Sequence, residues 1–190
     1  MPEATKRTQE EIIISGFGGQ GTLFAGQLLA YAAMDSGHYV TWIPSYGPEM
    51  RGGTARCTVI ISDEEIGSPL VRHPSAAIVL NIPSMEAFEP AVRPGGLLVV
   101  NSSLIPQHSE RTDIHALHIP ASDLASELGN VRLANVICLG ALVQLSGVVS
   151  LAAVEQALHD HLPERHRRLL EPNRLALNKG AALAREYLGP

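Results

Sequence analysis

The stretch IIISGFGGQGTLFAGQLL carries four glycines, at positions 16, 18, 19 and 21. Gly16, Gly18 and Gly21 satisfy the pattern G-x-G-x-x-G directly after a strand-like run and directly before a helix-like run. Glycines permit a tight turn and a close backbone approach, and the N–H groups at the start of the following helix point at an incoming anion. Together with Gly19 and Gln20, these residues form a candidate contact for a ligand phosphate or for the backbone of a partner.

Three uses of this glycine turn stay open. A nicotinamide or flavin site also has an acidic residue about 20 residues further on, which holds the ribose hydroxyls. The corresponding segment YVTWIPS has none, which counts against an independent dinucleotide-dependent oxidoreductase. The turn could also serve only the packing of helix and strand, or it could contact a phosphate or a partner chain.

A second candidate segment is the turn-rich loop in SYGPEMRGG, which follows a strand-like run. Open α/β sheets bind ligands at the carboxyl ends of their strands, which is where this loop should lie. From the residues alone it is interpreted as a surface loop with an internal contact between Glu49 and Arg51.

Other residue types with possible chemistry do not form a site. Cys57 lies in a strand-like run and is interpreted as an inert core thiol, and no serine lies in a G-x-S-x-G elbow. The basic cluster at Arg165, Arg167 and Arg168 is interpreted as a solvated helix face or a subunit contact. The histidines lack the cysteine or carboxylate pattern of a metal site: His115 and His118 lie in a strand-like run, and His159, His161 and His166 in a charged helical region. We therefore assign no catalytic residue and no metal site to this chain.

The elements that position these residues alternate between strand-like and helix-like runs. Strands are predicted at 11–15, 39–45, 54–62, 75–81, 95–103 and 113–120. Helices are predicted at 22–37, 82–94, 121–129, 132–147 and 151–162, with Pro163 and Pro172 dividing the remainder into two shorter pieces. Expected end signals are Gly37, Gly147, Ser150, and either Ser122 or Asp123. The pattern predicts an α/β fold, a three-layer domain with a mostly parallel or mixed sheet and a helical C-terminal part. We expect 1–190 to be a single domain, with 1–11 as a flexible terminus.

Composition sets the class of protein. The chain has 190 residues, 45% hydrophobic content and a formal net charge of −5, which argues against a nucleic-acid partner because phosphate binding needs a clustered basic face. No segment approaches the roughly 18 apolar residues of a membrane span. Two distant cysteines fit a reducing compartment, so we expect a cytoplasmic protein without nucleic-acid or membrane partners.

Several separated motifs, in order, resemble the gamma subunit of 2-oxoacid:ferredoxin oxidoreductases. They are GFGGQGT at 16–22, SYGPEMRGGTA at 45–55, SDEEIGSPLV at 62–71, NVICLGALVQLSG at 135–147 and NRLALNKG at 173–180. Enzymes of this family decarboxylate a 2-oxoacid on thiamine diphosphate, pass electrons through iron–sulfur clusters to ferredoxin and transfer the acyl group to coenzyme A. The form of the second motif looks more like the 2-oxoglutarate or branched-chain members than the pyruvate members, and we favour 2-oxoglutarate.

The resemblance implies a subunit that is inactive by itself. Thiamine diphosphate, Mg and [4Fe–4S] are expected in alpha and beta subunits, or in a ferredoxin-like delta subunit, with coenzyme A as co-substrate and ferredoxin as acceptor. A [4Fe–4S] cluster needs four cysteine thiolates, and the chain has two cysteines. The resemblance also gives the second segment a role in packing against partner subunits and shaping the active site, through Tyr46, Gly47, Pro48, Glu49, Arg51 and Gly52. An alternative is the related small subunit of indolepyruvate:ferredoxin oxidoreductase.

Overall fold

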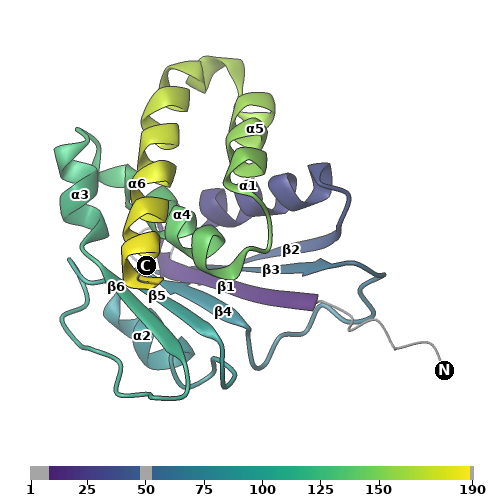
Figure 1. Ribbon diagram of the computed structural model, residues 1–190, viewed down its shortest axis with the longest axis vertical. Coiled ribbons are helices and arrows are strands. Elements are labelled where there is room, and N and C mark those ends of the chain that lie inside the picture. Colours follow the sequence, from purple (N-terminus) through teal and green to yellow (C-terminus); the bar gives the residue numbers. More distant parts are fainter. Residues whose placement is uncertain (1–8, 48–52, 189–190) are drawn as a thin grey trace.

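The computed structural model describes residues 9–47 and 53–188. A six-stranded sheet runs through the molecule in the order β2-β3-β1-β4-β5-β6 (Figure 1). The strands are β1 (Gln9–Phe17), β2 (Tyr39–Tyr46), β3 (Thr54–Ser62), β4 (Ala76–Val79), β5 (Leu97–Asn101) and β6 (His115–Ile119). β1, β4, β5 and β6 are parallel, whereas β3 pairs antiparallel with both β1 and β2. The sheet is therefore mixed, as predicted.

Alternation along the strands sends side chains into two apolar layers. Ile12 and Ile14 on β1 belong to the larger core, and Ile13 between them belongs to the smaller one on the opposite face. All four residues of β4 are buried, as expected for a central parallel strand covered on both faces. The fold is an α/β arrangement with helices on both sides of the sheet.

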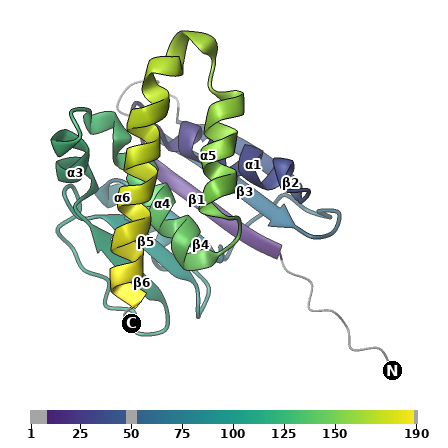
Figure 2. The ribbon, with the colours of Figure 1, turned by 45° about the horizontal axis from the view of Figure 1, so that its top comes forward.

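The two helical layers differ in size. Figure 1 shows α2 (Ile82–Phe88) on the side of the strands opposite to α4 (Ala134–Ser146) and α6 (Leu170–Leu188), and Figure 2 shows α5 (Leu151–His161) beside α1 (Thr22–Asp35). The remaining helical elements are α3 (Ala121–Glu127), η1 (Val131–Leu133) and η2 (Glu164–Leu169). The helical C-terminal part is confirmed, and within the described ranges no helix combines the length and the hydropathy that a bilayer crossing needs.

Three of the predicted end signals are confirmed. Gly37 and Gly147 have left-handed φ angles of 89° and 63° just beyond the ends of α1 and α4. Ser150 caps α5, because its hydroxyl accepts a hydrogen bond from the N–H of Ala153 at 3.0 Å.

Other local predictions were wrong. Neither Ser122 nor Asp123 is the N-cap of α3, which begins after Pro120. Their N–H groups instead donate to side chains at the end of β5, Asn101 Oδ1 at 3.3 Å and Ser103 Oγ at 3.1 Å. Capping by another element removes the need for a local cap.

Two predicted boundaries also need correction. Pro172 does not divide a helix, because it lies in the first turn of α6, where the missing N–H has no intrahelical partner to lose. Residues 9–11, predicted to belong to a flexible terminus, form the start of β1, where Gln9 pairs with Ser62 of β3. The strand begins with the polar residues Gln9, Glu10 and Glu11, so the pattern of apolar residues did not indicate that it starts there.

Candidate functional site

The glycine turn connects the end of β1 to the start of α1. Gly19 and Gly21 have φ angles of 100° and 77°, a backbone conformation that side chains rarely adopt. Gly18 is not among the described glycines with positive φ; its N–H donates to the carbonyl of Gly53 at 2.9 Å. No side chain caps α1, and its first turn holds no acidic residue. The N-terminus of α1 is therefore suited to an anion.

Gln20 braces this turn from within. Its Oε1 accepts a hydrogen bond from the N–H of Phe17 at 2.6 Å, and its Nε2 donates to the carbonyl of Leu80 at 3.1 Å. The brace lies so close to Gly16 that a Cβ there would come within 2.6 Å of Gln20 Oε1. Gly16 and Gln20 thus fix the turn against the end of β4.

Asn135, at the start of α4, locks the other side of the turn. Its Nδ2 donates to the carbonyl of Gly21 at 2.7 Å, and its Oδ1 accepts from the N–H of Val136 at 2.9 Å. A Cβ on Gly21 would lie 2.2 Å from Asn135 Nδ2, so glycine is required by both the φ angle and the contact. Sequence reasoning did not assign Asn135 a role, although it opens the motif NVICLG.

The second candidate segment begins beside this turn. β2 and β1 run in the same direction on either side of β3, and both Tyr46 and Gly16 pair with Ala55. Tyr46 is 65% exposed, and the N–H of Gly47 donates to the carbonyl of Thr54 at 2.8 Å. The two ends of the segment thus lie at the carboxyl edge of the sheet next to the glycine turn. Pro48, Glu49, Arg51 and Gly52 lie outside the described residues.

Two cavities flank the glycine turn. The smaller, of about 200 Å³, lies at the carboxyl ends of the central strands and includes Gln20, Asn101 and Ser122 in its lining. The larger, of about 740 Å³, is a groove between α1, η1, α5 and η2. Gly19 and Arg132 line both, so the turn lies where the two cavities meet.

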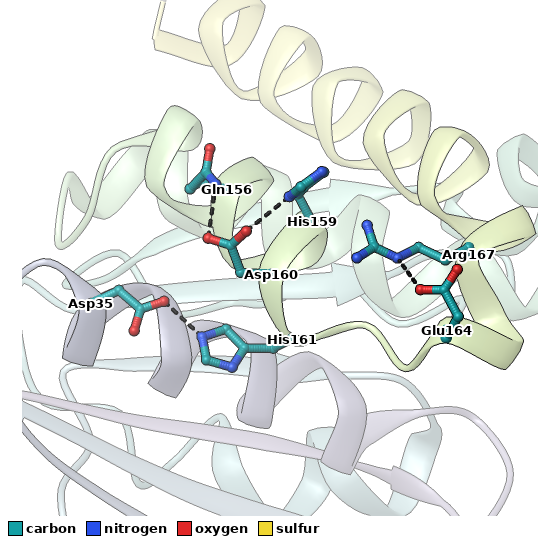
Figure 3. Close-up of polar contacts among 7 residues, drawn as sticks. All are labelled: Asp35, Gln156, His159, Asp160, His161, Glu164 and Arg167. Atoms are coloured by element: carbon teal, nitrogen blue, oxygen red, sulfur yellow. Dashed lines mark hydrogen bonds and ion pairs between the residues drawn. The ribbon is translucent and has the colours of Figure 1, made fainter.

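Figure 3 shows polar contacts on α5 and η2, of which those of His161 lie at the far end of the groove. His161 Nε2 lies 2.8 Å from Asp35 Oδ2, and its ring stacks on Tyr31 with centroids 4.0 Å apart. These contacts join the end of α5 to α1. A hydrogen bond from His159, followed by one from Gln156, lowers the pKa of the Asp160 carboxyl.

The predicted basic cluster lies on η2 and divides between two roles. Arg167 Nε lies 3.2 Å from Glu164 Oε2 (Figure 3), whereas Arg168 lines the groove. Arg165 Nε donates to His166 Nε2 at 3.2 Å. The cluster is thus partly a solvated helix face, which is one of the two interpretations made from the sequence, and partly the wall of a cavity.

The two thiols are unsuited to chemistry. Burial raises the pKa of the Cys57 thiol and of the Cys138 thiol to about 12, so neither is a thiolate at neutral pH. The interpretation of Cys57 as an inert core thiol is confirmed. Within the ranges 9–47 and 53–188, no three histidine, cysteine or carboxylate side chains gather as a metal site would require.

The family model for pyruvate ferredoxin/flavodoxin oxidoreductase matches residues 11–183. The chain belongs to this family. Among curated relatives, the ketoisovalerate oxidoreductase subunit VorA of Methanothermobacter marburgensis is 37% identical over 178 residues, which cover 92% of this chain and 36% of VorA. The 2-oxoglutarate synthase subunit KorC of the same organism is 35% identical over 94% of this chain and 98% of KorC. The chain therefore spans about a third of one relative and nearly all of the other.

Solved structures agree with this assignment. A keto/oxoacid ferredoxin oxidoreductase gamma subunit from Geobacter sulfurreducens superposes with a TM-score of 0.81 at 32% identity, covering 93% of this chain and 97% of that one. A 2-oxoglutarate:ferredoxin oxidoreductase from Magnetococcus marinus, with 2-oxoglutarate, coenzyme A and succinyl-CoA bound, has a TM-score of 0.84 at 26% identity over 93% of this chain and 31% of that chain. The α/β fold is that of the gamma subunit.

Proposed function

We propose that this chain is the gamma subunit of a multi-subunit 2-oxoacid:ferredoxin oxidoreductase that oxidises 2-oxoglutarate to its acyl-CoA and reduces ferredoxin. The observation that carries the proposal is the match to KorC and to the Geobacter sulfurreducens gamma subunit over nearly the whole of both chains. In VorA and in the Magnetococcus marinus enzyme, the matching region is about a third of a longer chain. This arrangement supports a subunit that works in direct contact with the rest of the enzyme.

The redox and decarboxylation chemistry belongs, in this proposal, to partner subunits. A [4Fe–4S] cluster needs four cysteine thiolates, and the two cysteines of this chain, Cys57 and Cys138, cannot supply them. We assign thiamine diphosphate, Mg and the clusters to alpha, beta and delta subunits in the cytoplasm. The isolated chain should then be colourless and inactive.

This chain contributes assembly and the shaping of the active site. The uncapped N-terminus of α1 and the left-handed Gly19 and Gly21 favour contact with a phosphate of coenzyme A or with a partner backbone. The segment from Tyr46 to Gly53 begins and ends beside that turn, which supports its role at the same interface. Gln20 and Asn135 act as positioning residues because their amides are bonded to the turn and its surroundings.

The acyl substrate is tested by a panel of 2-oxoacids. The chain is co-expressed with the partner subunits from its own source, and coenzyme-A-dependent reduction of viologen is measured with 2-oxoglutarate, 2-oxoisovalerate, pyruvate and indolepyruvate. The highest kcat/KM is expected for 2-oxoglutarate. A preference for 2-oxoisovalerate would move the chain to the VorA group, and a preference for indolepyruvate would favour the indolepyruvate:ferredoxin alternative. Tight binding of a nicotinamide cofactor by the isolated chain would favour an independent oxidoreductase.

The loop assignment is tested at Arg51. If its guanidinium pairs with a partner carboxylate or a cofactor phosphate that is buried on assembly, Arg51→Ala should cost about 2–5 kcal/mol of association or transition-state stabilisation. An exposed contact would cost roughly 0–1 kcal/mol. Subunit affinity and the KM for coenzyme A are measured in complexes with Arg51→Ala and Arg51→Lys, since lysine reproduces the guanidinium fork poorly. Parent-like values in both variants would remove the loop from the site.

A further inference from the structure

The strand β2 is an edge of the sheet with an open outer side. It is the first strand in the order β2-β3-β1-β4-β5-β6, and among the described strands it pairs with β3 alone. None of its eight residues is buried. Such an edge presents unpaired N–H and C=O groups, which proteins protect with charged side chains, proline or a covering segment. β2 carries one proline, Pro44, and no charged residue.

The pairing of β2 with β3 identifies the backbone groups that face outward. Just past the end of β2, the N–H of Gly47 donates to the carbonyl of Thr54, the residue directly opposite, at 2.8 Å. In an antiparallel pair, opposite residues that exchange hydrogen bonds alternate with opposite residues that do not. The odd-numbered residues of β2 therefore bond to β3, and the even-numbered residues point their backbone groups outward. The even-numbered residues are Val40, Trp42, Pro44 and Tyr46.

Pro44 limits where a further strand can pair. Proline has no N–H, and on an edge strand that position faces solvent. A strand that placed a residue opposite Pro44 would leave one carbonyl without a donor. Val40 and Trp42 each offer both an N–H and a C=O. Two copies of β2 that run antiparallel can therefore pair Val40 of each copy with Trp42 of the other, with two hydrogen bonds in each pair.

The same register brings exposed apolar side chains together. Val40 and Trp42 pack against the larger core on the α1 side, so Tyr39, Thr41 and Ile43 lie on the opposite face of the strand. Tyr39 is 50% exposed and Ile43 is 38% exposed. In the register described above, Tyr39 of each copy lies opposite Ile43 of the other. Pairs of an aromatic and a β-branched side chain at this position stabilise antiparallel sheets.

We propose that β2 is a docking surface for a second copy of this chain, whose β2 extends the sheet antiparallel in this register. The occupant is a second copy because the outward backbone groups and the exposed side chains of this edge are complementary to themselves, and β2 has no charge that would repel its own copy. Dimers with a two-fold axis are the commonest oligomers. Thr41 lies on that axis, opposite Thr41 of the second copy. The inference goes beyond the proposed function, because it concerns contact between copies of this chain.

The test is a charge exchange at Thr41 in the full chain. Sedimentation equilibrium measures mass against concentration for the parent, for Thr41→Lys, for Thr41→Glu and for an equal mixture of these two variants. Thr112→Lys and Thr112→Glu, at an exposed position before β6, are the controls with the same changes in charge. Thermal unfolding of each variant separates loss of association from loss of fold.

We expect the mass of the parent to rise with concentration toward twice the 20.3 kDa of one chain. Each Thr41 variant alone should associate roughly ten-fold more weakly or worse, because two like charges then face each other across the axis. The mixture should regain the association of the parent, because a lysine then faces a glutamate. The Thr112 variants should associate like the parent, both alone and mixed.

Amide hydrogen exchange, resolved by residue, is the second measurement. The N–H groups of Val40 and Trp42 should become more protected as the concentration of the parent rises, whereas those of Thr41 and Ile43 already bond to β3 and should not change. The proposal is overturned if the parent stays monomeric at the highest soluble concentration, if each Thr41 variant associates like the parent, or if their mixture associates no better than either alone. Protection of Val40 and Trp42 only after partner subunits are added would also overturn it, in favour of a strand from another subunit.

Discussion

Gly140 on α4 and Gly180 on α6 lie where these helices pack backbone against backbone. A Cβ on Gly140 would be 2.0 Å from the carbonyl oxygen of Leu177, and a Cβ on Gly180 would be 1.8 Å from that of Ile137. Real Cβ atoms essentially never come within 3.0 Å of another heavy atom. We predict that Gly140→Ala and Gly180→Ala each destabilise the fold, because the helices must separate by roughly 1 Å.

The magnitude follows from two opposing effects. Overpacking a core costs about 1–3 kcal/mol, and the upper value applies here because backbone atoms cannot avoid the contact by changing rotamer. Replacing glycine by alanine inside a helix returns about 1 kcal/mol of helix propensity. The net loss is about 2 kcal/mol, which in a chain of this size lowers Tm by about 4–8 °C.

Urea and thermal unfolding of the isolated chain measure this prediction. Gly67→Ala is the control, since a Cβ there has open space and its φ is not left-handed; it should change stability by less than about 0.5 kcal/mol. The double variant at Gly140 and Gly180 should lose less than the sum of the single losses, because one separation of the helices relieves both contacts. A single variant that melts at or above the parent temperature would refute the reasoning.

Three further outcomes are expected. Asn135→Ala removes the hydrogen bond to the glycine turn and should lower the free energy of unfolding in urea by about 1–2 kcal/mol. An unchanged free energy of unfolding would count against a stabilising role for that hydrogen bond. Burial, followed by the charge of a neighbouring histidine, lowers the pKa of His118 from 6.5 in the folded chain. As pH falls, the unfolded chain therefore takes up a proton at this residue before the folded chain does, so the folding stability present above about pH 6.5 is lost at lower pH. His118→Gln should reduce this acid dependence of Tm and His115→Gln, at an exposed position, should not. A thiol reagent at pH 8 should label neither Cys57 nor Cys138 until the chain is unfolded, and rapid labelling of the native chain would contradict their buried state.

The order of elements could be predicted from the sequence because the apolar runs are short and well separated. Ser150, Gly37 and Gly147 act on the element next to them, and such local signals are readable. The N-terminus of α3 could not be predicted, because its N–H groups donate to Asn101, the last residue of β5, and to Ser103, two residues further on. Patterns along a chain carry no information on which distant side chain satisfies an N–H group.

The candidate site was predictable only in part, because a sequence pattern shows its local turn but not its contacts between distant residues. The glycine pattern indicated a tight turn between a strand and a helix, and Gly21 of that pattern is left-handed. Gly18 of the pattern is not among the described glycines with positive φ, and Gly19, which is, lies outside the three pattern positions. The lock by Asn135 joins residues 114 positions apart, and the groove is assembled from α1, η1, α5 and η2. Arg132 and Arg168 therefore gave no signal as a pair until the helices were placed side by side.

The most direct test of the central claim is an omission assay. Coenzyme-A-dependent reduction of ferredoxin by 2-oxoglutarate is measured with the partner subunits alone, and again after this chain is added back in equimolar amount. If the chain is a gamma subunit that takes part in assembly and shapes the active site, turnover should be low without the chain and restored when it is added. Equal rates in both samples would contradict the account.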